Sequence, residues 1–183
     1  MYIMSITVDG LQLLDPGILP TLAVPSIPST VRANQDAGFS VVKYTGDQTN
    51  GASVAHGLGK VPHMILAKNL DSATSWITLH VTPNTTTGFS GGHLNTTDNL
   101  VDLSQTENRA QSWNNQAPDA NVFYLGDDNG NWAGTLNNNE DYIAYCWSEV
   151  PGFSKFSSYE GNDSTSGPFI YTGFKPAFVM IKC

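Results

Sequence analysis

The sequence has few charged residues, and those it has are mostly acidic. Charged side chains make up 13% of the 183 residues, against roughly a quarter in an ordinary globular chain. Eight Lys and Arg face sixteen Asp and Glu, which gives a net charge of −8. Nucleic acids and anionic membranes both require a basic surface. The composition therefore argues against both partners.

Cysteines and long apolar runs are also scarce. Cys146 and Cys183 are too few for a disulfide framework, and the apolar surroundings of Cys146 predict a buried thiol. No stretch is apolar enough to span a bilayer, and the first residues lack the features of a signal peptide. We expect no membrane insertion. Release by cell lysis would explain any activity outside a cell.

Amphipathic helical stripes are absent, whereas Asn, Thr, Ser and Gly are abundant. These residues favour turns and strand faces over helices. Asn-Gly at residues 129–130 is typical of a tight hairpin. Short apolar or alternating runs predict strands at residues 39–44, 53–56, 64–68, 76–81, 101–103, 122–125 and 141–150. This pattern predicts an all-β protein, an antiparallel β-sandwich or jelly roll.

The sequence contains an internal repeat. A Gly-Phe-Ser tripeptide opens two segments, residues 38–68 and residues 152–182, and each ends with a proline six residues before a lysine. Matching positions lie 114 residues apart at both ends. Such duplication favours a binding or structural protein over a compact enzyme. We expect one β-sandwich domain over residues 38–183 that contains both repeat units.

Residues 1–37 differ from the rest of the chain. Pro20, Pro25 and Pro28 forbid a helix and favour an extended conformation. Apolar residues such as Ile18 and Leu22 are more frequent here than in disordered segments. We interpret residues 1–37 as an extended arm that docks on a sister subunit or a larger assembly. A disordered linker is the alternative.

The sequence contains the motifs AGFSVVKYTG (37–46), HGLG (56–59), WNNQAP (113–118), YIAYCW (142–147), GFSKF (152–156) and YTGFKP (171–176). Together these motifs resemble a repeated β-rich domain of tailed phages, especially marine and cyanobacterial ones. The resemblance covers roughly residues 33–183. It implies a lectin-like sandwich in a tail-fibre or other virion protein, commonly a trimer, with no catalytic residues.

The chain departs from that family after Lys182. The second repeat normally continues there with another tryptophan-bearing strand, whereas this sequence stops at Cys183. Two interpretations are open. Either the second unit completes the sandwich begun by the first, or the chain is part of a longer protein.

Aromatic residues are the candidates for sugar binding, because an exposed ring can stack on a sugar while neighbouring amides bind hydroxyls. Trp132 lies between two polar turns beside Asn131, which makes this pair the best candidate, and Trp113 is a further one. Trp76 and Trp147 lie in apolar runs and are expected in the core.

Metal and catalytic sites have weak support. Asp127, Asn129 and Asn131 offer oxygens at alternating positions and faintly resemble a calcium loop, but a polar hairpin is favoured. The four histidines are dispersed, and His56 is expected to stabilise a turn rather than bind a ligand. Four glutamates, Glu107, Glu140, Glu149 and Glu160, are too scattered for a glycosidase pair. We expect no enzyme and no obligatory cofactor.

These observations favour a phage virion protein at the particle surface, in a tail fibre or tail tip. It would bind host-surface glycans, and residues 1–37 would attach it to other virion proteins. The alternative is a capsid decoration or cement protein with a purely structural role.

Overall fold

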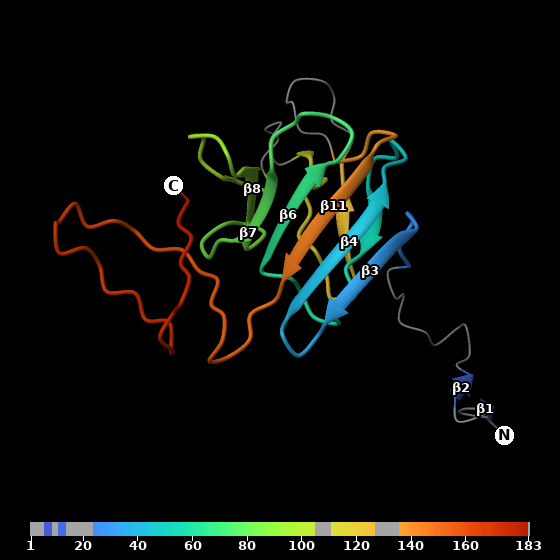
Figure 1. Ribbon diagram of the computed structural model, residues 1–183, viewed down its shortest axis with the longest axis horizontal. Helices are drawn as coiled ribbons and strands as arrows, with labels where there is room; N and C mark the ends of the chain where they lie inside the picture. The colour runs from blue at the N-terminus through green and yellow to red at the C-terminus, as the bar shows by residue number, and fades with distance from the viewer. Residues whose placement is uncertain (1–5, 9–10, 14–23, 105–110, 127–135, 183) are drawn as a thin grey trace.

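The computed structural model describes residues 6–8, 11–13, 24–104, 111–126 and 136–182 of the chain. These residues form an all-β fold, as the sequence predicts (Figure 1). The strands are β1 (Ile6–Val8), β2 (Leu11–Leu13), β3 (Ser29–Asn34), β4 (Phe39–Thr45), β5 (Ala52–Ala55), β6 (Met64–Asn69), β7 (Ile77–Val81), β8 (Phe89–His93), β9 (Val101–Asp102), β10 (Val122–Leu125) and β11 (Asp141–Trp147).

A seven-stranded antiparallel sheet dominates the fold, in the order β3-β4-β11-β6-β7-β8-β9. β11 lies between β4 and β6 and pairs with both along its length. The strand predicted over residues 64–68 is therefore central in its sheet, as its apolar composition indicates. A two-stranded sheet of β5 and β10 completes the sandwich, and β1 pairs with β2 separately.

The core lies between the seven-stranded sheet and the β5–β10 pair. Tyr44 from β4 packs edge-on against Phe123 from β10, with ring centroids 6.0 Å apart. Cys146 is fully buried here, which confirms the predicted buried thiol. Packing between two sheets that each bury one face is the defining feature of a β-sandwich.

The boundary expected at residue 37 is wrong for the residues just before it. β3 is an edge strand of the main sheet, paired along its length with β4. Ile27 is buried, and its N–H donates to the carbonyl of Ser53 at 3.0 Å. Edge strands tolerate flanking prolines because one side of the backbone needs no partner. This part of the expected arm therefore belongs to the sandwich.

The second repeat unit behaves differently from the first. Residues 38–68 supply β4, β5 and β6, whereas no strand is assigned over residues 152–182. Figure 1 shows this part of the chain leaving β11 and running beside the sandwich as a long irregular loop. Of the two interpretations left open by the sequence, the one in which the second unit completes the sandwich is wrong, because residues 152–182 contribute no strand to either sheet.

Candidate functional site

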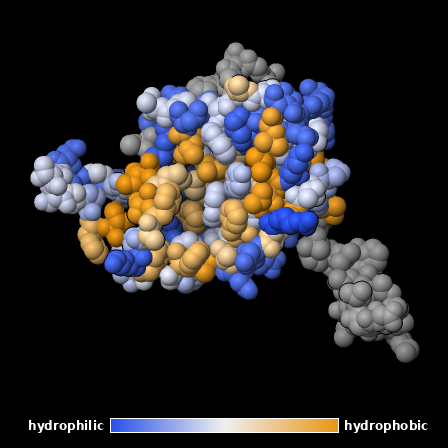
Figure 2. All heavy atoms as spheres, viewed as in Figure 1, coloured by the Kyte–Doolittle hydropathy of each residue, from blue (hydrophilic) through white to orange (hydrophobic). Residues whose placement is uncertain are grey.

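The main sheet has one face buried in the core and one face turned away from the β5–β10 pair, which we call the outer face. On β11 the side chains of Tyr142, Ala144 and Cys146 are fully buried. The alternate residues Tyr145 and Trp147 are half-buried on the outer face. Because successive side chains of a strand point to opposite faces, these large aromatic rings lie on the outer face. Figure 2 shows several groups of apolar side chains in this view, with hydrophilic side chains between them.

Four aromatic side chains form a cluster at one end of the outer face, and we call it the outer aromatic cluster. Trp147 lies opposite Phe39 in the β11–β4 register, with ring centroids 5.3 Å apart. The Tyr145 ring lies 6.2 Å from Trp147 and 6.4 Å from Trp76. The main-chain N–H of Trp76, just before β7, donates to Asn95 Oδ1 at 2.9 Å. Strand pairing and this hydrogen bond hold the rings on a rigid frame.

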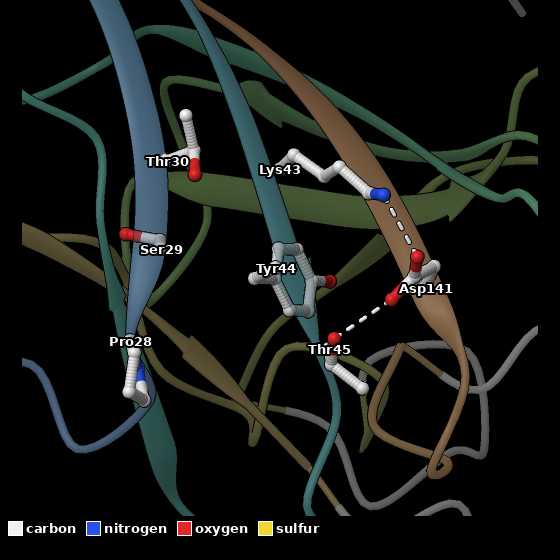
Figure 3. A pocket seen from close by; sticks show the side chains of 7 residues that line it. All are labelled: Pro28, Ser29, Thr30, Lys43, Tyr44, Thr45 and Asp141. Atoms are coloured by element: carbon white, nitrogen blue, oxygen red, sulfur yellow. Dashed lines mark hydrogen bonds and ion pairs between the residues drawn. The ribbon is translucent and has the colours of Figure 1, made fainter.

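A polar group occupies the other end of β11 on the same face (Figure 3). Lys43 Nζ lies 2.8 Å from Asp141 Oδ2, and the hydroxyl of Thr45 donates to Asp141 Oδ1 at 2.7 Å. The hydrogen bond from Lys43 holds the pKa of the Asp141 carboxyl below its usual value. A shallow depression of about 370 Å³ adjoins this group and continues towards Ser29 and Thr30 of β3. The charged and hydroxyl groups could hydrogen-bond a polar ligand.

The start of the C-terminal segment packs near the same face. Phe156 stacks on His63 at 6.1 Å between ring centroids and approaches His80 at 6.4 Å. The main-chain N–H of Glu149 donates to His63 Nδ1 at 3.0 Å, so this nitrogen is unprotonated. Burial lowers the pKa of both histidines. These neutral imidazoles act as packing groups for Phe156.

Of the two tryptophans predicted to bind a sugar, the structure describes only Trp113. Trp113 is fully buried, its indole N–H donates to the carbonyl of Thr78 at 3.0 Å, and its ring packs edge-on against Phe123. The suggestion that Trp113 binds a sugar is therefore wrong, because its ring has no open face. The other sugar-binding candidates, Trp132 and Asn131, lie outside the described residues.

The metal candidates Asp127, Asn129 and Asn131 also lie outside the described residues. Among the residues that the structure does describe, no group of three His, Cys, Asp or Glu side chains is placed to hold a metal ion. Over the same residues, no helix is long and apolar enough to cross a membrane.

The role expected for His56 is confirmed. The ring is fully buried, and Nδ1 accepts a hydrogen bond from the main-chain N–H of Leu58 at 3.2 Å. Nε2 lies 3.1 Å from the carbonyl of Asp119. Both ring nitrogens are therefore engaged in holding the turn after β5, and burial lowers the pKa of the imidazole.

Sequence reasoning missed the outer aromatic cluster. Trp76 and Trp147 are half-buried on the outer face rather than enclosed in the core. The signal was present in residues 141–147, because a period of two places Tyr145 and Trp147 together on the face opposite Ala144 and Cys146. The continuous apolar character of this run concealed that alternation.

Comparison with known proteins gives one match. No curated protein and no solved structure matches the chain. A family model, described as a domain of unknown function (DUF7483), matches residues 21–183. The match includes β3, consistent with the place of this strand in the main sheet. Since the matched residues are most of the sequence, the chain belongs to the DUF7483 family.

Proposed function

We propose that this chain is a virion surface protein of a tailed phage, in a tail fibre or tail tip, that binds host-surface glycans through the outer aromatic cluster. One observation carries the proposal: Phe39, Trp76, Tyr145 and Trp147 gather half-buried on a sheet face. Apolar patches of this kind on soluble proteins commonly mark interaction sites. The sequence resemblance to phage fibre domains supports the biological setting.

The chemistry of the face suits a sugar. Aromatic rings provide an apolar platform for the C–H face of a pyranose, while their polar edges tolerate water. Lys43, Thr45 and Asp141 provide donors and acceptors at the other end of β11. A single shallow site of this type binds weakly. A trimeric fibre would raise the avidity by presenting several copies to one cell surface.

A second candidate is a capsid decoration or cement protein. The observation that favours it is the exposure of large apolar side chains in the C-terminal segment, where Phe169 is 90% exposed and Phe178 is 80% exposed. Such side chains suit permanent contact with other virion proteins. In either setting, the residues before Ile27 would contribute to attachment.

The test is binding of the full chain to a microarray of bacterial lipopolysaccharide O-chains and capsular polysaccharides. Trp147→Ala should weaken binding about tenfold, a change of about 1.4 kcal/mol in binding free energy. Trp132→Ala should leave binding unchanged. The opposite result would locate the site at Trp132. Absence of binding to any glycan, combined with increased heat resistance of virions that carry the protein, would favour the cement function.

A further inference from the structure

The C-terminal repeat unit exposes the side chains that the first unit buries. Ile65 and Ala67 of β6 are fully buried, whereas Val179 and Ile181, which match them in the repeat, are 65% and 63% exposed. Phe178 is 80% exposed and matches Met64, which is 6% exposed. Residues 178–182, which we call the C-terminal strand segment, thus have the composition of a central strand without a sheet around them.

The second repeat unit contains the same turn as the first repeat unit. In the first copy, Asp47 Oδ1 accepts from the N–H of Thr49, and Ala52 N–H donates to the Thr49 carbonyl. The second copy repeats both hydrogen bonds, from Ser164 N–H to Asn162 Oδ1 and from Gly167 N–H to the Ser164 carbonyl. Each of these positions lies 115 residues after its counterpart.

Backbone conformation follows the repeat as well. Gln48 and Asp163 both adopt a left-handed conformation, with φ of 62° and 51°. Gly59, which precedes β6, and Gly173, at the matching position of the second unit, have φ of 68° and 81°. The second copy therefore has the turns of a folded repeat unit, and among the described residues it lacks only the strands that would pair with it.

The first copy identifies the missing partner. β6 pairs antiparallel with β11, and Ala144 and Cys146 of β11 lie opposite Ala67 and Ile65. These small side chains leave room for branched residues across the strand pair. The position that matches Ala67 in the second copy is occupied by Ile181, which is larger than alanine. A partner strand therefore needs small apolar residues at alternate positions, as β11 has.

We propose that the C-terminal strand segment is a docking site for a β-strand of the β11 type, which adds antiparallel to residues 178–182. Main-chain hydrogen bonds would provide affinity, and alternate side chains would provide specificity, as in other cases of strand addition. Lys182 fixes one end of the segment, because its Nζ donates to the carbonyls of Thr96 and Asp98, each at 2.6 Å. The partner strand belongs to another polypeptide, because β11 of this chain already pairs on both sides, with β4 and with β6.

The test uses the full chain and a fluorescent synthetic peptide of residues 139–149, which spans β11. Fluorescence anisotropy should show saturable binding. Val179→Asp combined with Ile181→Asp should weaken it about tenfold or more, because these side chains face the partner's small residues. The matched control is Phe178→Asp with Met180→Asp, which places the same charges on the other face and should change affinity less than about threefold.

Four results would overturn the proposal. The first three are no binding of the peptide, an equal loss of peptide affinity in both double variants, and amide hydrogen-exchange protection at β3 or β9 instead of at residues 178–182. A fourth is a chain that dimerises by itself and is made monomeric by the Val179 and Ile181 changes, which would identify a second copy as the occupant. All four variant side chains are exposed, so the folded sandwich should keep its unfolding temperature. None of these readouts involves a sugar, so the result is independent of the glycan proposal.

Discussion

Trp147 and Phe39 lie directly opposite each other on neighbouring strands, with ring centroids 5.3 Å apart on the outer face of the main sheet. Behind them, Cys146 and Ser40 form the next pair in the register and are fully buried. At this end of the β4–β11 pair, small side chains therefore face the core and large aromatic ones face outward. The buried side chains are therefore needed for stability, whereas the side chains on the outer face are those proposed for binding.

Two tryptophans should differ sharply in their contribution to stability. Trp113→Phe removes a buried hydrogen bond to the Thr78 carbonyl and leaves a gap beside Phe123, so we expect a loss of about 1–3 kcal/mol in the free energy of unfolding. Trp147→Phe, on the outer face, should cost less than about 1 kcal/mol. Urea denaturation of the two variants measures both values. Equal losses would contradict the placement of the two rings.

The repeat provides a matched pair of glycines with different surroundings. Gly38 and Gly152 both have positive φ, at 62° and 77°. A methyl group on Gly38 would collide with the carbonyl oxygen of Ser148 and lie 2.8 Å from Val150 Cγ2, whereas one on Gly152 would meet no atom within 4 Å. Both alanine variants incur the left-handed strain of about 1–2 kcal/mol.

Only Gly38→Ala adds the collision, so its unfolding temperature should fall well below that of Gly152→Ala. Thermal denaturation followed by circular dichroism makes the comparison. Similar melting temperatures would show that the β3–β4 turn does not pack against the end of β11 as described.

Stability should fall as the solution is acidified below the pKa of an ordinary histidine. Burial lowers the pKa of His56, His63 and His80 below 6.5, so the unfolded chain binds protons before the folded chain does. The stabilisation is therefore complete above pH 6.5 and decreases as pH falls towards the lowered values. Unfolding free energies measured from about pH 8 to about pH 5 give the slope.

His56→Gln should flatten part of that slope, because it removes one of the three groups. His63 and His80 should account for the remainder, since their shifts have the same direction. A slope unchanged in the His56 variant would show that this imidazole is already accessible to protons in the folded state.

The Cys146 thiol should resist alkylation in the folded protein. Burial raises its pKa to about 12, so almost no thiolate is present at neutral pH. Iodoacetamide labelling of a Cys183→Ser variant isolates this thiol. Modification should appear only when denaturant unfolds the chain, and labelling at the rate of a free thiol in buffer would contradict its burial between the sheets.

The sequence predicted the sandwich because most strands have a local signature. β4, β6 and β10 coincide closely with the predicted runs, since alternating or apolar segments bounded by turn residues specify strands well. β3 was missed because the nearby prolines suggested an arm. Its place in the sheet depends on antiparallel pairing with the next strand, β4, and the composition of residues 29–34 alone does not reveal this pairing.

The second repeat shows the limit of this reasoning more clearly. Residues 178–182 resemble β6 in composition, yet no strand forms there. Strand propensity largely reflects packing against neighbouring strands, and β11 already pairs with β4 and β6. The turn at residues 162–167 forms because its hydrogen bonds are local. Local similarity therefore reproduces turns but cannot supply a sheet.

The glycan-binding account is tested most directly by the indole N–H resonances of the chain. It has four tryptophans, Trp76, Trp113, Trp132 and Trp147, so each candidate location has its own signal in a ¹⁵N-labelled sample. Titration with the oligosaccharide that binds best on the microarray should shift the Trp76 and Trp147 signals and leave Trp113 unchanged. A shift confined to Trp132, or no shift at a saturating concentration, would contradict the assignment of the site to the outer face.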